Sequence, residues 1–497
     1  MDEKQIEGVK LPVKFKIRPN NDCIDISGLT DDQRKAYDEL IKFIQSDFNP
    51  DDYVRALSGA AGTGKTYLIQ AVIRNCGLAS SVIGLSAPSH KAVRVLKESV
   101  GNVNDNVTTF QSAFGFRPDY NIDNFDYKKV KFSAKEGMTK VSNYRLFIVD
   151  EASMINKKFL EYMKVVMLNL RCKIILMGDA YQLPPVGDAR SAAFTGVRTC
   201  QLNKIVRQDD DNPVRYLLDL LRYDIKHHTT YFLTYISKNK GAHDNTFTKG
   251  YSVVGASEFK RQVGLYFSNG NILTDTDYCR VIAYTNRAVS SWNKYVRNCI
   301  VAQSDKSVIT KNDLVTSYNT IVDEFGGTVI NNSEDYIVHD IANYYHPDYG
   351  LKGFVVSFQA IHGGKISNPL FVLDHTDMES LRAYCQIAMN LIDSAKSAGS
   401  LSGLKWKRFY KFRDKILLLQ NIGRSDGTIM LSRTLDYGFS ITAHKAQGST
   451  YDVAMVDVND IVFDKNGYIY NNIDDMNRRL YVACSRCKNK LILSYGN

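Results

Sequence analysis

Residues 54–66 read VRALSGAAGTGKT, a short apolar run that passes directly into a glycine-rich octet. The octet at 59–66 matches GxxxxGK[ST], and the segment after it, 67–74, has a helical pattern. Glycines in such a loop let backbone N–H groups approach phosphate oxygens at a helix N-terminus, whose dipole favours anions. The stretch therefore predicts a strand, a phosphate-binding loop and a helix. An accidental glycine-rich turn is the alternative, and the surrounding strand and helix argue against it.

The expected roles within this loop follow from the chemistry of a bound nucleotide. Lys65 is suited to neutralise the β and γ phosphates, and the Thr66 hydroxyl is suited to ligate Mg²⁺. ATP and Mg²⁺ are therefore the predicted cofactors. The loop residues expected to contact the nucleotide are Gly59, Ala60, Ala61, Gly62, Thr63, Gly64, Lys65 and Thr66.

A second apolar run, 146–149, ends in the adjacent carboxylates Asp150 and Glu151. Behind a phosphate-binding loop, Asp150 is suited to the Mg²⁺ shell and Glu151 to orienting and deprotonating an attacking water. Without that loop, an acidic pair at the end of a strand could equally be a solvated turn. The second carboxylate favours hydrolysis with turnover over nucleotide binding alone.

A third run, 174–177, leads into GDAYQLPP at 178–185. The Gln182 side chain is able to sense a γ-phosphate, and the two prolines stiffen the loop that carries it. A proline-fixed turn without a catalytic role stays open as an alternative. Similar runs at 82–85, 281–283, 453–456 and 491–493 predict parallel strands buried on both faces, hence an α/β fold with ligands at the carboxyl ends of the strands.

Composition narrows the class of protein. The chain has 497 residues and a formal net charge of +10, with 44% hydrophobic and 11% aromatic residues, which argues against intrinsic disorder. No apolar run approaches the ~20 residues of a membrane span, and the first residues lack the apolar core of a signal peptide. Nine scattered cysteines, including an isolated CxxC at 484–487, indicate reduced thiols. We expect a soluble, cytoplasmic, multidomain protein without a membrane partner.

The series of motifs is more specific than any one of them. GAAGTGKT, SAPSHKAV, DEAS, GDAYQLPPV, LNKIVRQ, VIAYTNRAV, ITAHKAQGST and LYVACSRCKNKL occur in this order from about residue 29 to the C-terminus. The series resembles superfamily 1 helicases of the B branch, the group of the Dda-like and RecD-like enzymes. The resemblance implies two RecA-like motor domains with ATP between them and single-stranded DNA across both.

The resemblance also implies a domain division. We expect an N-terminal extension at 1–28, a first RecA-like domain at 29–106 and 142–204, and a second at 205–307 and 419–497. A small β-hairpin domain is expected at 107–141, inserted in the first. An SH3-like β unit with added helices is expected at 308–418, inserted in the second. The fold class is thus α/β with two insertions.

Further nucleotide-site residues come from the same resemblance. Gln33 corresponds to the glutamine that reads the adenine edge, and Arg207 and Arg486 correspond to arginines that reach the γ-phosphate from the second domain. Such an arginine couples phosphate chemistry to domain closure. Gln447, followed by Gly448, corresponds to a residue at the junction of the ATP and DNA sites and is able to serve either.

The expected DNA contacts lie at equivalent strand ends of the two halves, where hydroxyl, imidazole and backbone groups suit sugar-phosphate contacts without reading sequence. A lone histidine is ordinarily a core or surface residue, and only the motif assigns it to DNA. The predicted contacts are Pro88, Ser89, His90, Thr109, Gln111, Thr285, Asn286, Thr442, His444 and Lys445.

The segment FRPDYNIDNFDYKKVKF at 116–132 surrounds a turn-like stretch with aromatic and basic residues. An aromatic side chain at a hairpin tip is able to stack on a base at the point of strand separation. We therefore predict Phe125 as the strand-separating wedge. The alternative is that these aromatics only pack the hairpin on its own domain.

The functional hypothesis is an ATP-dependent DNA helicase that moves 5′ to 3′ on single-stranded DNA, with strand junctions as substrates. A single-strand-binding protein and other replication or recombination proteins are possible partners. The first alternative is a translocase or DNA-stimulated ATPase that needs a partner to unwind. A nucleic-acid-binding protein with a degenerate ATPase site and a P-loop kinase are further alternatives. The intact motifs argue against the former, and the second RecA-like half argues against the latter.

Overall fold

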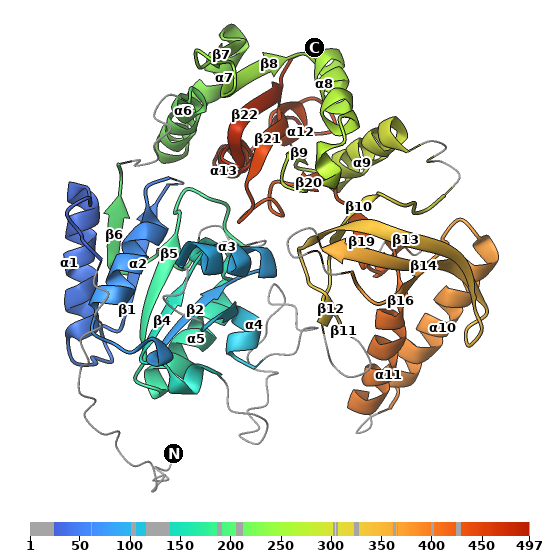
Figure 1. Cartoon of the computed structure of the whole chain (residues 1–497), viewed down its shortest axis with the longest axis horizontal. Coiled ribbons are helices and arrows are strands. Elements are labelled where there is room, and N and C mark those ends of the chain that lie inside the picture. The colour runs from blue at the N-terminus through green and yellow to red at the C-terminus, as the bar shows by residue number, and fades with distance from the viewer. Residues whose placement is uncertain are drawn as a thin grey trace, which may run out of the picture.

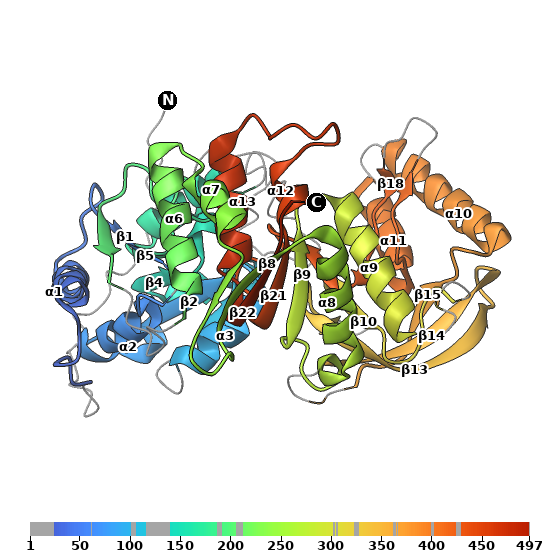
Figure 2. The same cartoon turned by 90° about the horizontal axis from the view of Figure 1, so that it is seen from above.

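The computed structural model describes residues 24–496 apart from 61, 101–105, 116–139, 186–190, 205–211, 302–303, 305–306, 323–327, 361–363, 365, 399–401 and 424–428. These residues form three units, each built on a six-stranded sheet. We call residues 24–204 the first domain, residues 212–301 with 438–496 the second domain, and residues 307–437 the insertion. Figures 1 and 2 show the first domain at one end of the molecule, the insertion at the other and the second domain between them.

The first domain has an entirely parallel sheet in the order β3-β2-β4-β5-β1-β6. Alternate residues of β4 enter different cores: Leu146 and Ile148 pack with one set of helices, Phe147 and Val149 with the other. Burial on both faces explains why β4 is a continuous apolar run. The strands are β1 (Val54–Gly59), β2 (Ile83–Ala87), β3 (Val107–Thr109), β4 (Leu146–Val149), β5 (Lys173–Gly178) and β6 (Thr199–Leu202), and the helices are α1 (Asp31–Gln45), α2 (Lys65–Asn75), α3 (His90–Val100), α4 (Phe110–Ala113) and α5 (Lys157–Asn169).

The second domain repeats this plan with the order β20-β9-β21-β22-β8-β7, parallel except for the edge strand β7. Neighbouring residues of β9 again face opposite cores, with Val281 on one side and Ile282 on the other. The strands are β7 (Gly241–His243), β8 (Gly250–Val254), β9 (Cys279–Ala283), β20 (Ser440–Thr442), β21 (Tyr451–Asp457) and β22 (Cys487–Ser494), and the helices are α6 (Val214–His227), α7 (Tyr231–Lys238), α8 (Ala256–Ser268), α9 (Asn286–Ile300), α12 (Val458–Val462) and α13 (Ile473–Cys484).

The insertion has the sheet order β16-β15-β14-β13-β10-β19, which is antiparallel except between β15 and β16. A helical pair packs on this sheet through an apolar cluster that includes Phe371, Tyr384 and Phe412. Its elements are β10 (Leu314–Ser317), β11 (Ile321–Val322), β12 (Thr328–Ile330), β13 (Asp335–His346), β14 (Leu351–Ala360), β15 (Leu370–Leu373), β16 (Ile416–Leu417), β17 (Ile422–Gly423), β18 (Ile429–Leu431), β19 (Leu435–Tyr437), α10 (Met378–Lys396) and α11 (Ser402–Lys415).

The α/β prediction with parallel sheets is confirmed, while two expected boundaries differ from the strand pairing. β3 belongs to the first sheet because it pairs in parallel with β2, although 107–141 was expected to be a separate hairpin domain. β19 pairs with β10, so the insertion continues past 418 to 437. Apolar runs of three or four residues do not reveal which sheet they join, because pairing is a long-range property. The SH3-like character of the insertion stays a prediction.

No helix in the described part of the chain is both long enough and apolar enough to cross a membrane.

Candidate functional site

The phosphate-binding loop joins β1 to α2. Gly62 and Gly64 have φ of +83° and +75°, a region that favours glycine. A Cβ on Gly59 would lie 2.5 Å from the Thr63 hydroxyl, so this position also requires glycine. Lys65 Nζ donates to the carbonyl oxygens of Gly59 (2.6 Å) and Ala60 (3.1 Å). The ammonium thus points into the loop, while Thr66 follows in the first turn of α2. Ala61 lies outside the described residues.

Gln33 connects the start of α1 to this loop. Its side chain accepts from the Thr30 backbone N–H (3.0 Å) in a capping box, and its Nε2 donates to the Thr63 carbonyl (2.9 Å). The side chain is almost fully buried. The structure therefore places the predicted adenine-reading residue next to the phosphate-binding loop.

The two carboxylates follow β4 as expected. Glu151 has φ of +49°, an uncommon conformation for a residue with a side chain, and its N–H donates to Asp150 Oδ1 (2.9 Å). Glu151 Oε2 is buried, and no hydrogen-bond partner for it is found in the described part of the chain. Burial and the neighbouring Asp150 raise the pKa of Glu151 to about 7, against the opposing effect of Arg486 and Lys65. Burial also raises the pKa of Asp150, and Lys65 opposes that shift. A carboxyl with a pKa near neutrality is well matched to a general base.

Gln182 lies after β5 in the loop predicted from GDAYQLPP. Its side chain is buried, and its Oε1 has no hydrogen-bond partner among the described residues. An unsatisfied buried amide oxygen is costly unless a further group supplies a donor. In a nucleotide-bound state, an attacking water is a donor of suitable chemistry.

Helix α13 of the second domain holds this loop. Arg478 Nη1 donates to the carbonyl oxygens of Ala180 (2.7 Å) and Gln182 (3.1 Å), and the Tyr481 hydroxyl donates to Asp179 Oδ2 (2.7 Å). Sequence reasoning did not select Arg478 or Tyr481. The available signal was their position on the same helix that leads to Arg486.

Two predicted second-domain residues also lie at this interface. Gln447 Nε2 donates to the Leu183 carbonyl of the first domain (3.0 Å), and Gly448, at φ +72°, brings its backbone near Ala92. Arg486 is buried, and its guanidinium donates to the carbonyl oxygens of Val482 and Ser449 (both 3.1 Å). Because Arg486 lowers the pKa of Glu151, its charge acts on the first-domain carboxylate. Arg207 lies outside the described residues.

The predicted DNA-contact residues of the first domain lie at the ends of β2 and β3. The Ser89 hydroxyl accepts from the Ala92 N–H (3.2 Å), and the Thr109 hydroxyl accepts from the Ser112 N–H (3.3 Å), so both cap helices. His90 is half-buried, and burial lowers its pKa. Pro88 precedes this turn and is also half-buried. Gln111 lies in α4, but its side chain is outside the described set.

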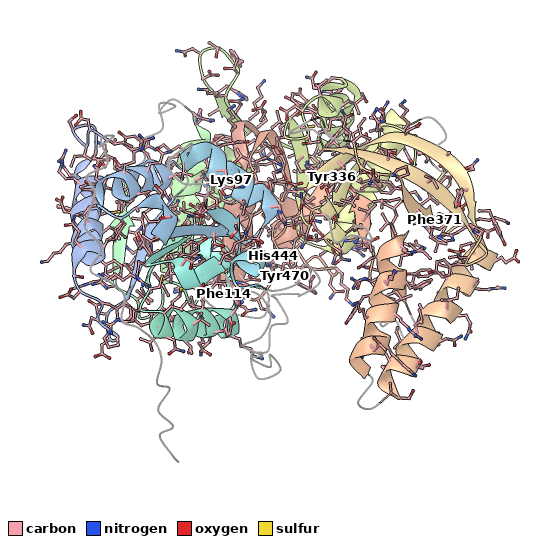
Figure 3. The ribbon with its side chains drawn as sticks, turned by 60° about the horizontal axis from the view of Figure 1, so that its bottom comes forward. Lys97, Phe114, Tyr336, Phe371, His444 and Tyr470 are labelled. Carbon is pink, nitrogen blue, oxygen red and sulfur yellow. The ribbon has the colours of Figure 1, made fainter. Side chains whose placement is uncertain are left out.

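The predicted DNA-contact residues of the second domain lie at two places, the start of α9 and the end of β20. The Thr285 hydroxyl donates to Asp460 Oδ1 (2.6 Å) and caps α9, whereas Asn286 is exposed. The Thr442 hydroxyl accepts from the Lys445 N–H (3.2 Å). Figure 3 shows His444 near the middle of the molecule, and burial lowers the His444 pKa.

Lys445 differs from the expectation of a phosphate contact. Its Nζ donates to the Ser317 carbonyl of the insertion (3.2 Å) and lies 3.2 Å from the centre of the Tyr318 ring. Burial lowers its pKa to about 7, although Asp335 and Asp436 oppose that shift. In this conformation Lys445 packs against the insertion.

A second contact between the units is built from charges. Lys91 of α3 is buried, and its Nζ lies 2.6 Å from Asp277 Oδ1 in the second domain and 3.7 Å from Asp335 Oδ2 in the insertion. Arg280 pairs with the same Asp335 oxygen at 2.9 Å. Sequence reasoning quoted Lys91 within its motif but gave it no role.

The predicted wedge Phe125 lies outside the described residues. The structure describes Phe114, upstream of it, packed edge-on against Phe147 (5.8 Å) and Phe159 (5.5 Å) in the first-domain core.

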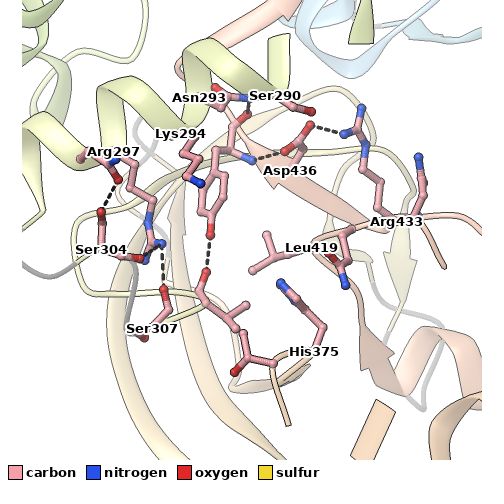
Figure 4. A pocket seen from close by; sticks show the side chains of 16 residues that line it. Ser290, Asn293, Lys294, Arg297, Ser304, Ser307, His375, Leu419, Arg433 and Asp436 are labelled. Atoms are coloured by element: carbon pink, nitrogen blue, oxygen red, sulfur yellow. Dashed lines mark hydrogen bonds and ion pairs between the residues drawn. The ribbon is translucent and has the colours of Figure 1, made fainter. Parts of the chain in front are cut away.

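A polar pocket of about 450 Å³ lies between α9 and the insertion (Figure 4), and no described residue of the phosphate-binding loop lines it. Two of its cations already have partners: Arg297 pairs with Asp313 (3.0 Å) and Arg433 with Asp436 (2.5 Å). No cluster of three or more potential metal-ligating side chains is found within the described ranges. Thr66 and Asp150 stay the residues predicted to hold Mg²⁺ together with the nucleotide phosphates.

The chain is similar to several known proteins. Residues 28–234 match the AAA domain family. An uncharacterized protein of Acanthamoeba polyphaga mimivirus is 24% identical, covering 92% of this chain and 98% of that protein. The ATP-dependent DNA helicase Dda of Enterobacteria phage T4 is 26% identical over 56% of this chain and 59% of its own length.

Two further proteins are similar over different lengths. The ATP-dependent RecD2 DNA helicase of Deinococcus radiodurans is 27% identical, and the match covers 38% of this chain and 23% of that enzyme. The crystal structure of Pif1 helicase from Candida albicans overlaps 94% of each chain, with 17% identity and a TM-score of 0.47. The AAA domain match and the similarity to Dda and RecD2 support the resemblance of this chain to superfamily 1 helicases of the B branch, the group of the Dda- and RecD-like proteins.

Proposed function

We propose that this chain is an ATP-dependent DNA helicase that translocates 5′ to 3′ on single-stranded DNA and unwinds duplex DNA. The observation that carries the proposal is the division of the nucleotide site between two domains. Lys65, Glu151 and Gln182 come from the first domain, and the charge of Arg486 reaches Glu151 from the second. A site completed by both domains links each hydrolysis event to their relative motion.

The chemistry assigned to each group follows from its surroundings. Lys65 and the N–H groups at the start of α2 bind the phosphates, and Glu151 accepts a proton from the attacking water. Gln182 orients that water through its unsatisfied Oε1. Arg486 stabilises charge that develops on the γ-phosphate. Thr66 and Asp150 would hold Mg²⁺, which supplies further charge neutralisation when bound.

Movement along DNA requires contacts in both domains that release in alternation. The Ser89–His90 turn and Thr109 supply such groups in the first domain, and Thr285, Asn286, Thr442 and His444 supply them in the second. Contacts of this kind bind sugar and phosphate without reading sequence. Gln447 connects this region to the Gln182 loop through Leu183. The direction of movement rests on the resemblance to the B branch.

A strand-displacement assay on tailed duplexes tests the proposal. We expect unwinding of duplexes with a 5′ single-stranded tail, little activity on 3′ tails, and loss of both unwinding and DNA-stimulated phosphate release in Lys65→Ala. Unwinding of only 3′-tailed duplexes would overturn the direction.

The second candidate function is a single-strand translocase that needs a partner to unwind. DNA-stimulated phosphate release without strand displacement would favour it. Repeating the assay with a single-strand-binding protein then tests whether such a partner supplies unwinding.

A further inference from the structure

Helix α11 of the insertion concentrates the positive charge of the chain. Its 14 residues, SGLKWKRFYKFRDK, carry six basic side chains and one acidic side chain, a net +5. The whole chain has a net charge of +10. Half of the excess charge therefore lies on one helix, at the end of the molecule opposite α1 (Figures 1 and 2).

The two faces of α11 differ sharply. Phe409 and Phe412 are buried in the cluster that joins the helix to α10 and the insertion sheet, and Phe412 stacks on Tyr384 with ring centres 5.2 Å apart. Lys407, Arg408 and Lys411 are exposed on the outer face. Anchoring by the inner aromatics fixes the position of the outer cations.

The outer cations carry their charge without a described partner. Within the described ranges, the side chains of Lys407, Arg408 and Lys411 make no ion pair or hydrogen bond. By contrast, Arg413 pairs with Asp414 (2.8 Å) and lies over the Tyr410 ring (5.1 Å). Like charges three and four residues apart on a helix repel each other, so the bare face is destabilising until an anion covers it.

The spacing suits a polyanion with regularly placed charges. Lys407 and Lys411 are separated by about 6 Å along the helix axis. Phosphates of one strand of a duplex recur about every 3.4 Å along its axis, so this separation matches about two nucleotide steps. A helix anchored in this way fits a stiff backbone with fixed phosphate positions.

We propose that Lys407, Arg408 and Lys411 form a surface that binds the phosphate backbone of duplex DNA, separate from the single-strand contacts of the two motor domains. This inference rests on the proposed function, because it takes the duplex portion of a helicase substrate as the ligand. The surface tethers the unopened duplex beside the enzyme without reading its sequence.

The test replaces the three cations in the full chain with the triple variant Lys407→Gln/Arg408→Gln/Lys411→Gln. Fluorescence anisotropy measures binding to a blunt DNA duplex and to a single strand of equal length at several salt concentrations. We expect the salt slope for the duplex to decrease by about 0.9 for each lost phosphate contact. From 50 to 200 mM salt, duplex affinity should then fall about 40-fold less in the variant than in the unaltered protein.

A matched control separates local contact from overall charge. Lys35 and Lys42 on α1 and Lys238 at the end of α7 are also exposed, so Lys35→Gln/Lys42→Gln/Lys238→Gln removes the same charge elsewhere. The control should retain the original duplex slope. The variant Lys407→Arg/Lys411→Arg, which keeps the charge, should do so as well.

The outcomes distinguish the surface from the function. Equal duplex slopes in the α11 variant and the control overturn the surface proposal. Equal losses on duplex and single strand also overturn it, because the helix would then contact the single-stranded track. Intact single-strand-stimulated ATPase in the α11 variant shows that the ATP site and the single-strand contacts still work, so failure of the surface proposal is distinguishable from failure of the proposed function. Absence of DNA binding and of DNA-stimulated ATPase in the unaltered protein would remove both proposals together.

Discussion

Beside the candidate nucleotide site, the first domain meets the second through hydrogen bonds to the Gln182 loop, mostly to its backbone carbonyls. Through Lys91 of α3, the first domain also meets the second domain and the insertion in a cluster of buried charges. Arg478 and Gln447 donate to carbonyls of the loop, whereas Lys91 enters a cluster with Asp277, Asp335 and Arg280. A hydrogen bond to one carbonyl can be replaced by a hydrogen bond to another at little cost in free energy. Separating a buried ion pair costs more, because each charge loses its partner. The first contact is suited to adjust during turnover, and the second to hold a defined state.

The largest effect should come from the nucleotide side. Glu151→Gln removes the proton acceptor while preserving side-chain size, so we expect ATP hydrolysis to fall about 10²- to 10⁴-fold with ATP binding retained. Phosphate release and fluorescent-nucleotide binding measure the two quantities. Glu98→Gln, at an exposed site on α3, is the matched control. Unaltered hydrolysis in Glu151→Gln would remove this residue from the role of base.

The nucleotide site and the charge cluster should differ in how they respond to pH. Glu151 acts as a base only when deprotonated, and its pKa is raised to about 7, so kcat/KM for ATP should rise with pH and level off above neutrality. We expect about tenfold lower kcat/KM at about pH 6 than at about pH 8. On the charged side, Arg280 and Lys91 outweigh burial and hold the pKa of Asp335 at about 2, so that ion pair does not titrate in this interval. A flat profile between these pH values would contradict the assignment of Glu151.

The charged contact should be broken by Lys91→Ala. Asp335 keeps Arg280 as a partner and Asp277 is partly exposed, so the loss should be limited to about 1.5–3 kcal/mol, the range for a hydrogen bond to a charged group. Denaturant unfolding measures it. Lys97→Ala, an exposed lysine on the same helix, should change stability little. Equal stability of both variants would show that the charge cluster does not hold the domains together.

Where the signals of the candidate nucleotide site are local, the sequence was enough to predict the positions of its residues, while their roles stay predictions. The loop glycines, Lys65, Asp150 and Glu151 sit within single strand-loop units, and each position is set by its own strand end. The family motifs contain Gln182 and Gln447, so the sequence could also assign these two residues to the site between the two domains.

Residues whose roles depend on distant partners were missed. Lys91 pairs with Asp277, and Tyr481 with Asp179, across separations of 186 and 302 residues. Neither residue type is unusual on a helix, so the pattern of one helix cannot reveal its partner. The end of the insertion was misplaced for the same reason, because β19 pairs with β10 more than a hundred residues earlier.

The smallest expected effect tests whether α13 positions the Gln182 loop. Tyr481→Phe keeps the buried ring but removes the hydroxyl that donates to Asp179 Oδ2. Losing one such hydrogen bond costs about 0.5–1.5 kcal/mol, which corresponds to a decrease of about 2- to 12-fold if the whole loss falls on the transition state. A positioning role predicts that kcat for DNA-stimulated ATP hydrolysis falls while KM for ATP is unchanged, because Asp179 lies in the loop that carries Gln182 and not in the phosphate-binding loop. Tyr235→Phe is the control, since it removes a hydroxyl bonded to Tyr251 elsewhere in the second domain. A fall in stability with kcat unchanged would instead mean that this hydrogen bond only holds the two domains together. The contact beside the nucleotide site would then have the same structural role as the Lys91 charge cluster.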